Sequence, residues 1–112
     1  MKPKILLPSL KEKKRYLAFE LISDEKIAFE KVKQAIRMEM NQLIGNLGLA
    51  KAGLMFLDDW KDNKGILRIN NKMVNETKAA LTMIKEIDNQ KAIVKSIGLS
   101  GILNKLRQKG GF

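Results

Sequence analysis

The alternation of apolar and polar positions predicts that the chain opens with a strand and continues into a long helix. Between residues 15 and 22, Leu17, Phe19 and Leu21 fall on one face of an extended chain and alternate with Tyr16, Ala18 and Glu20 on the other, which is typical of a strand. The run Ser23-Asp24-Glu25 then offers a polar cap and acidic side chains at a helix start. We predict a helix from there to about Ile44, ended by Gly45-Asn46. Its apolar positions recur at spacings of three and four: Phe29, Val32, Ile36, Met40, Leu43 and Leu47.

The rest of the chain predicts a hairpin, a second long helix, a strand and a short helix. Lys61-Asp62-Asn63-Lys64-Gly65 has the composition of a hairpin turn between two alternating segments. The second helix begins near Asn71 and carries an apolar stripe towards Ile87. The elements expected after the first helix are strands at 54–60 and 66–70, the second helix, a strand at 91–97, a turn at 98–101 and a basic helix at 102–108.

This order of elements predicts an α+β fold, the ferredoxin-like split βαβ sandwich. Two strand–helix–strand units joined by a hairpin form one four-stranded antiparallel sheet, with both long helices packed on one face. A short C-terminal helix follows. We divide the chain into a basic N-terminal arm (1–14), a single domain (15–109) and a tail (110–112). The fold serves many functions, so it does not by itself decide this one.

The net charge of the chain is +10, and the excess lies at its two ends. Residues 1–15 carry six basic side chains and one acidic one, and residues 91–112 carry five basic side chains and no acidic one. The stretch 16–90 holds eleven of each and is neutral overall. Clustered positive charge attracts phosphate backbones and releases their counterions. We therefore expect a nucleic-acid-binding protein rather than one whose charge only keeps it dispersed.

The chain contains no cysteine and no histidine, which removes several kinds of chemistry. Disulfides, thiolate metal sites and the commonest general base are all excluded. No catalytic triad or metal-ligand cluster can be assembled from the other residues, so we expect neither a catalytic site nor a bound metal. No apolar run approaches the roughly 20 residues of a membrane span, and no secretory signal is evident. We expect a soluble, cytoplasmic protein.

The predicted sheet lacks the aromatic residues on which an RNA-recognition motif stacks bases. Lys64-Gly65 opens the third strand as that motif does, but Ile66 and Arg68 stand where the aromatics belong. The first strand offers only Tyr16, followed by Ala18. This sheet face is instead partly apolar, which suits a protein partner or a covering helix.

Two short motifs each have a structural reading and a functional one. Asp58-Asp59 precedes the hairpin, but neighbours on a strand point to opposite faces, so we read these residues as solvated charges rather than as a metal site. Gly98-Leu99-Ser100-Gly101 precedes the last helix, where Ser100 caps the helix or also contacts an RNA phosphate. The lysine of a nucleotide-binding P-loop is absent from this motif.

Three separated segments resemble a known family. They are Lys13-Lys14-Arg15-Tyr16-Leu17-Ala18-Phe19-Glu20, the third strand with the helix that follows it from Gly65 to Leu81, and Ile97-Gly98-Leu99-Ser100-Gly101-Ile102. In this order they resemble the archaeal ribonuclease P protein component 2 family, the Pop-five family of ribonuclease P subunits. The resemblance runs from about Lys13 to Lys109 and implies the same ferredoxin-like fold.

The resemblance implies a protein subunit of an RNA-based endoribonuclease that removes the 5′ leader from precursor tRNA. Catalysis would then belong to the RNA, with Mg2+ bound by the RNA and its substrate rather than by this chain. The implied partners are the catalytic domain of ribonuclease P RNA, ribonuclease P protein component 3, other protein subunits and, indirectly, precursor tRNA. A homodimer within a heterotetramer is also implied. Asp58 and Asp59 correspond to no family site.

The candidate contact residues follow from charge, from their positions on the predicted elements and from the resemblance. For RNA we select Lys11, Lys13, Lys14, Arg15, Arg68, Lys95, Ser100, Lys105 and Arg107. For protein interfaces we select Ala18, Phe56, Ile66 and Ile102. The main rival is a ribosomal or other RNA-scaffold protein of the same fold. A small-molecule regulatory domain would need a pocket and a ligand loop that the sequence does not offer, and the lack of histidine and cysteine with scattered carboxylates argues against a stand-alone nuclease.

Overall fold

The computed structural model describes residues 13–110 of the chain. Lys11, most of the predicted arm at 1–14 and residues 111–112 lie outside the described part. Strands and helices alternate in the order that the apolar pattern predicts, with one further short strand. The strands are β1 (Lys14–Ser23), β2 (Met55–Phe56), β3 (Lys64–Asn70), β4 (Glu86–Ile87) and β5 (Gln90–Ser100). The helices are α2 (Phe29–Ala52), the short 3-10 helix η2 (Asn71–Met73), α3 (Val74–Met83) and α4 (Leu103–Gly110).

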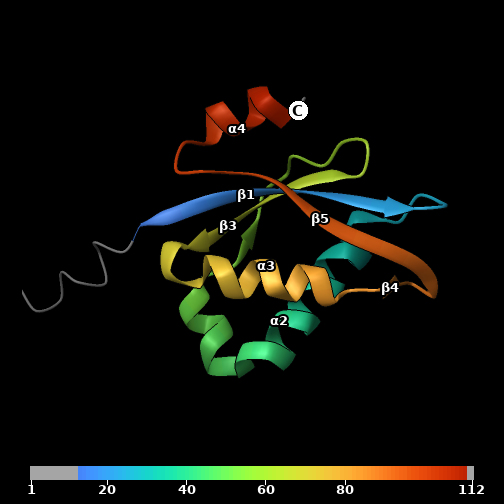
Figure 1. The fold of residues 1–112 in the computed structure, drawn as a ribbon, viewed down its shortest axis with the longest axis horizontal. Helices are drawn as coiled ribbons and strands as arrows, with labels where there is room; N and C mark the ends of the chain where they lie inside the picture. Colours follow the sequence, from blue (N-terminus) through green and yellow to red (C-terminus); the bar gives the residue numbers. More distant parts are fainter. Residues whose placement is uncertain (1–12, 111–112) are drawn as a thin grey trace, which may run out of the picture.

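The sheet has five strands in the order β2-β3-β1-β5-β4, and its pairings are antiparallel. The prediction of four strands was therefore wrong, because β4 adds a two-residue strand beside the start of β5. Helices α2 and α3 cover one face of the sheet, as predicted (Figure 1). Helix α4 lies across the opposite face (Figure 1). Strand β1 is central in the sheet, so it pairs with β3 on one side and with β5 on the other.

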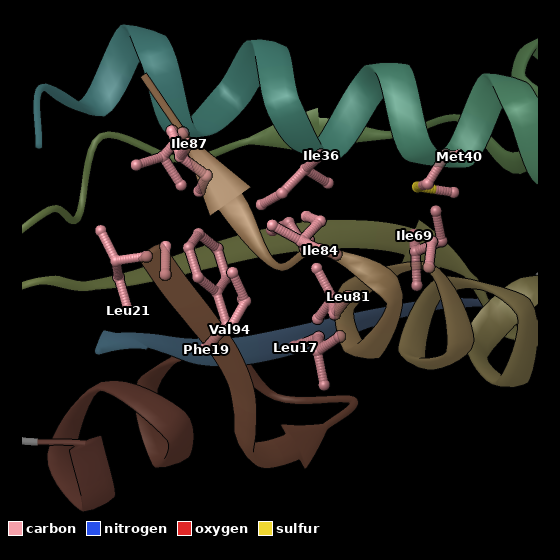
Figure 2. Packing of buried hydrophobic residues seen from close by; sticks show 14 of the residues in the cluster. Leu17, Phe19, Leu21, Ile36, Met40, Ile69, Leu81, Ile84, Ile87 and Val94 are labelled. Atoms are coloured by element: carbon pink, nitrogen blue, oxygen red, sulfur yellow. The ribbon is translucent and has the colours of Figure 1, made fainter. Parts of the chain in front are cut away.

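The main core fills the space between the sheet and the helices α2 and α3. Leu17, Phe19 and Leu21 of β1 point into it, as their alternation predicts, and meet Ile36 and Met40 of α2 (Figure 2). Fully burying an aliphatic or aromatic side chain of this size contributes about 1.5–3 kcal/mol to folding. This core fixes β1, and β1 in turn fixes the strands on either side of it.

Helix α2 starts later and ends later than the sequence suggests. The Ser23 hydroxyl donates to the carbonyl of Glu25 and closes a turn, so the helix begins only at Phe29. Gly45 leaves the helical conformation (φ 74°, ψ 174°), as the predicted end there requires, but a second helical segment follows this kink and belongs to the same α2. The true end is Gly53, whose left-handed conformation (φ 62°) suits glycine, and whose N–H donates to the carbonyl of Ala50.

The strand predicted at 54–60 is much shorter, because β2 ends at Phe56. In the described residues, only Leu57, whose N–H donates to the carbonyl of Ile66 at 3.0 Å, and an isolated bridge between Lys61 and Lys64 continue the pairing with β3. Trp60 turns back into an aromatic cluster in which its ring stacks on Phe29 at 4.7 Å between centroids. Phe56 meets the edges of both Phe19 and Phe29. Gly65 leaves room for this cluster, since a Cβ there would lie 2.7 Å from the Phe19 ring.

The same dipeptide, Asp-Asn, forms the turn of both hairpins. Asp62 and Asn63 have φ values of 51° and 61°, and Asp88 and Asn89 have values of 53° and 64°. Two consecutive left-handed residues define the tight hairpin turn whose twist matches paired strands. The first turn confirms the predicted hairpin. The second turn pairs β4 with β5. The sequence pattern predicted that the second helix continues towards Ile87, but α3 ends at Met83.

Strand β5 is longer than predicted and absorbs most of the turn expected at 98–101. It continues to Ser100 and pairs with β1 from Ala92 onwards, so Tyr16 lies opposite Ser100. An irregularity between Ala18 and Phe19 leaves Ile97 as an extra residue on β5. In the described residues, no helix is both long enough and apolar enough to cross a membrane.

Candidate nucleic-acid interface

Helix α4 is fixed to the sheet by a small second core. Leu106 is 2% exposed and packs on Ala18 and Ile66. Gly98 makes this close approach possible, because a Cβ at that position would lie 2.8 Å from a methyl carbon of Leu106. The surrounding partly buried residues are Tyr16, Leu57 and Leu103. The central part of this sheet face is therefore covered by α4.

An ion pair ties α4 to the segment that follows β2. Arg107 donates from Nε to Oδ2 of Asp59 at 2.7 Å and from Nη2 to Oδ1 at 3.0 Å. The hydrogen bond to Asp59 raises the pKa of Arg107, so the guanidinium is charged at every pH used for RNA binding. The prediction that Asp59 is only a solvated charge was wrong, because its side chain is 15% exposed and serves α4. In the described residues, no group of acidic side chains could hold a metal.

Two adjoining hollows border α4 and share Gly98, Leu106 and Lys109. The larger, of about 470 Å³, extends to Ser100 and Lys105. The smaller, of about 270 Å³, extends to Lys64 and Ile97. We call this pair of hollows the α4 groove. Lys105 and Lys109 are exposed, and neither forms an ion pair with another described residue. The α4 groove therefore offers unneutralised positive charge on a floor of mixed polar and apolar residues.

The start of β1 and the end of β5 meet beside this groove. Tyr16 pairs with Arg68 on one side and with Ser100 on the other, so the three form one row across the sheet. The Arg15 guanidinium lies beside Gly101, with Nη1 3.1 Å from the position that a Cβ would take there. The basic ends of the described chain are thus neighbours, because β1 and β5 are adjacent strands.

Three of the predicted RNA contacts have informative surroundings. The Ser100 hydroxyl accepts from the N–H of Ile102 and donates to its carbonyl, which closes the turn before α4. The Nε atom of Arg68 is buried and has no hydrogen-bond partner among the residues that the structure describes. Lys95 lies opposite Glu20, on the other side of β1 from Lys64, and is not among the residues that line the α4 groove. RNA contact by each of them stays a prediction.

Lys13 and Lys14 are exposed at the start of β1. The Nζ atom of Lys14 lies 3.3 Å from the position that a Cβ at Gly53 would occupy. Lys14 therefore reaches towards the end of α2, whereas its neighbour Arg15 reaches towards the β5–α4 junction. The run Lys13-Lys14-Arg15, predicted as one RNA contact, serves at least two places on the surface.

The four residues predicted for protein interfaces have different fates. Ala18 and Ile66 are 1% and 0% exposed beneath α4, so they are not available to a partner in this conformation. Of the two occupants that the sequence left open for this face, the structure shows the covering helix. Phe56 belongs to the aromatic cluster, where the Arg37 guanidinium lies 5.2 Å from its ring centre. Ile102 is 54% exposed, and its role in an interface stays a prediction.

Sequence reasoning missed two lysines of the α4 groove, Lys64 and Lys109. Lys64 was considered only as part of the hairpin turn and of the Lys64-Gly65 dipeptide shared with an RNA-recognition motif, within a stretch that is neutral overall. Its register was the usable signal, since Lys64 pairs with Glu20 on the same face as the residues under α4. Lys109 was counted in the basic C-terminal segment, and its i, i+4 spacing from Lys105 places the two on one side of a helix.

Residues 15–110 match the sequence model of the Rpp14/Pop5 family. The chain belongs to the Rpp14/Pop5 family. It is 42% identical over 109 residues to ribonuclease P protein component 2 of Thermococcus gammatolerans, covering 96% of this chain and 91% of that protein. It is 36% identical to the protein of the same name from Pyrococcus furiosus, with the same coverage. The one from Methanosarcina mazei is 32% identical and is matched over 95% of this chain and 90% of its own length.

The fold of this Rpp14/Pop5 member also occurs in a solved ribonucleoprotein. A chain in the cryo-EM structure of yeast ribonuclease MRP superimposes with a TM-score of 0.64, covering 89% of this chain and 92% of that one. The two sequences are 11% identical, so this likeness concerns the fold.

Proposed function

We propose that this chain is an RNA-binding protein subunit of ribonuclease P, which assists the catalytic RNA in removing the 5′ leader from precursor tRNA. The observation that carries the proposal is the match over almost the whole chain to proteins named ribonuclease P protein component 2. The basic α4 groove supports it physically, because phosphate contacts supply most of the affinity that does not depend on sequence. We further propose that the protein acts in the cytoplasm.

The proposed role is electrostatic rather than catalytic. A folded RNA concentrates phosphate charge that repels both itself and its RNA substrate. Lys105 and Lys109, with Arg15 nearby, would lower this repulsion and reduce the Mg2+ concentration needed for folding and substrate binding. The Mg2+ ions themselves would be held by the RNA.

We propose ribonuclease P RNA, through its catalytic domain, and ribonuclease P protein component 3 as direct partners. Other protein subunits, and precursor tRNA indirectly, complete the proposed assembly, in which two copies of this chain would sit within a heterotetramer. The exposed Ile102 and the partly exposed Phe56 are the remaining candidates for protein contact. Ile102 lies at the start of α4, next to the α4 groove, so a protein there would also border the RNA.

Reconstitution tests this proposal directly. The chain is combined with a ribonuclease P RNA and component 3, and cleavage of precursor tRNA is measured at limiting Mg2+. We expect a rise in rate that requires this chain, and no cleavage by the chain alone. If the rate is unchanged although the chain binds RNA tightly, the protein belongs to another RNA assembly and the proposal fails.

A further inference from the structure

A second basic hollow lies at the end of the sheet where β1 begins and α2 ends. It has a volume of about 360 Å³ and is lined by Lys51, Asn70, Lys72 and Met73. Lys51 belongs to the last turn of α2, and Lys72 to η2, which leads into α3. None of these residues lines the α4 groove. We call this hollow the α2–η2 pocket.

Backbone contacts hold the walls of the α2–η2 pocket in place. The Asn70 side chain is buried, at 4% exposure, and its Oδ1 accepts from the N–H of Lys72 at 2.9 Å. The N–H of Asn71 donates to the carbonyl of Lys13 at 2.8 Å, which ties η2 to the start of β1. Lys14 of β1 extends its ammonium group to Gly53, two residues after Lys51. Three separate elements thus bring lysines to one place.

The lysines at the α2–η2 pocket are not neutralised by an ion pair within the described chain. Lys14, Lys51 and Lys72 are exposed, and none of them forms an ion pair with a described residue. Exposed lysine side chains normally move apart in water because their charges repel. Here the three lysines start from elements whose backbones are fixed to one another, so they stay close together. A multivalent anion placed among them would relieve their mutual repulsion and gain several charge-assisted hydrogen bonds.

We propose that the α2–η2 pocket binds a backbone phosphate of RNA, at a site separate from the α4 groove. This inference rests on the proposed function, since it takes the chain to be an RNA-binding subunit. The ligand is the RNA backbone rather than a base, because the lining offers ammonium groups and no exposed aromatic ring. Two basic sites on different parts of the fold would let one subunit hold two segments of a folded RNA.

Paired lysine substitutions test the α2–η2 pocket against a matched control. Lys51→Ala with Lys72→Ala removes two exposed lysines from the pocket, and Lys31→Ala with Lys85→Ala removes two exposed lysines elsewhere. Binding to ribonuclease P RNA is measured over a range of salt concentrations. We expect the pocket variant to lose affinity on the order of tenfold and to lower the salt slope by about one to two units. The control should keep the slope of the wild type.

Each outcome of this experiment decides something different. If the pocket variant and the control variant lose affinity to the same extent, binding depends only on the net charge of the chain, and the α2–η2 pocket is not a binding site. If the wild-type chain itself fails to bind the RNA, the proposed function fails and takes this inference with it. Circular dichroism checks that both variants fold, which their exposed positions favour.

Directed cleavage of the RNA gives a second, independent test. The chain has no cysteine, so Asn71→Cys and Gln108→Cys each create a unique attachment point for an iron chelate that generates hydroxyl radicals. Asn71 adjoins the α2–η2 pocket, and Gln108 lines the α4 groove. We expect the two positions to cleave different nucleotides of the bound RNA. Cleavage from Gln108 without cleavage from Asn71 would overturn the proposal.

Discussion

Arg107 and Asp59 are 48 residues apart in the sequence, yet each uses two atoms to hold the other. The pair joins the last helix to an irregular segment that would otherwise be an edge of the sheet. The pair also means that Arg107, which was predicted to contact RNA, already forms an ion pair within the fold.

Removing Asp59 should loosen α4 while leaving the rest of the fold intact. In Asp59→Ala we expect the amide hydrogens of α4 to exchange roughly two- to fivefold faster, the size of effect typical of partly exposed ion pairs. Asp58→Ala is the control, because Asp58 is exposed and adjacent but forms no ion pair in the described residues. Equal exchange rates in the two variants would show that the pair does not hold α4.

Truncating Leu106 should destabilise the second core. Leu106→Ala leaves a cavity above Ala18 and Ile66, and we expect a loss of about 2–3 kcal/mol in the free energy of unfolding. Urea denaturation measures this loss. Ile102→Ala is the matched control, since Ile102 is 54% exposed and its truncation should change stability by less than about 0.5 kcal/mol.

Adding a methyl group at Gly65 should disturb the aromatic cluster. The new Cβ would lie 2.7 Å from Cζ of Phe19 and 3.1 Å from Cε3 of Trp60, and Phe19 is fully buried and cannot withdraw. We expect Gly65→Ala to cost about 1–3 kcal/mol and to alter the fluorescence of the single tryptophan. Gly101→Ala should be mild, because only the flexible end of Arg15 approaches that position. A stable Gly65→Ala protein with unchanged fluorescence would contradict this packing.

Lysines of the α4 groove should contribute to RNA binding through charge. Lys105→Ala with Lys109→Ala is expected to weaken binding uniformly across RNA sequences and to lower the salt slope by about one to two units. Filter binding at several salt concentrations measures both quantities. Lys31→Ala with Lys85→Ala again serves as the control of equal charge. A loss of affinity confined to one RNA sequence would indicate base recognition instead.

The apolar pattern predicted most of the fold, because each central strand has one face in the main core. The alternation of Leu17, Phe19 and Leu21 identifies β1 for this reason. Glycine was a weaker guide: Gly45 and Gly53 both have a positive φ, but the sequence does not tell that α2 resumes after the first and ends at the second. The turn at Asp88-Asn89 could have been predicted from the sequence, since it repeats the dipeptide of the predicted hairpin.

The candidate site was harder to predict than the fold. Summing charge over segments concealed Lys51, Lys64 and Lys72, which lie in the stretch that is neutral overall. Proximity in space decides local potential, and it depends on strand order and on where a helix ends. The place where α4 packs on the sheet was also difficult to predict, because this helix has few apolar residues. Leu103 and Leu106 are one turn apart and are the only strong signal of a buried side.

The covering of Ala18 and Ile66 by α4 has a consequence for how an RNA could be selected. Over that part of the sheet no aromatic ring is exposed, so a nucleobase has no side chain there on which to stack. Discrimination would then come from the spacing of phosphates, which an RNA acquires only after it has folded. A subunit of this kind would tolerate wide sequence drift in its RNA, provided that the three-dimensional shape of the backbone persists.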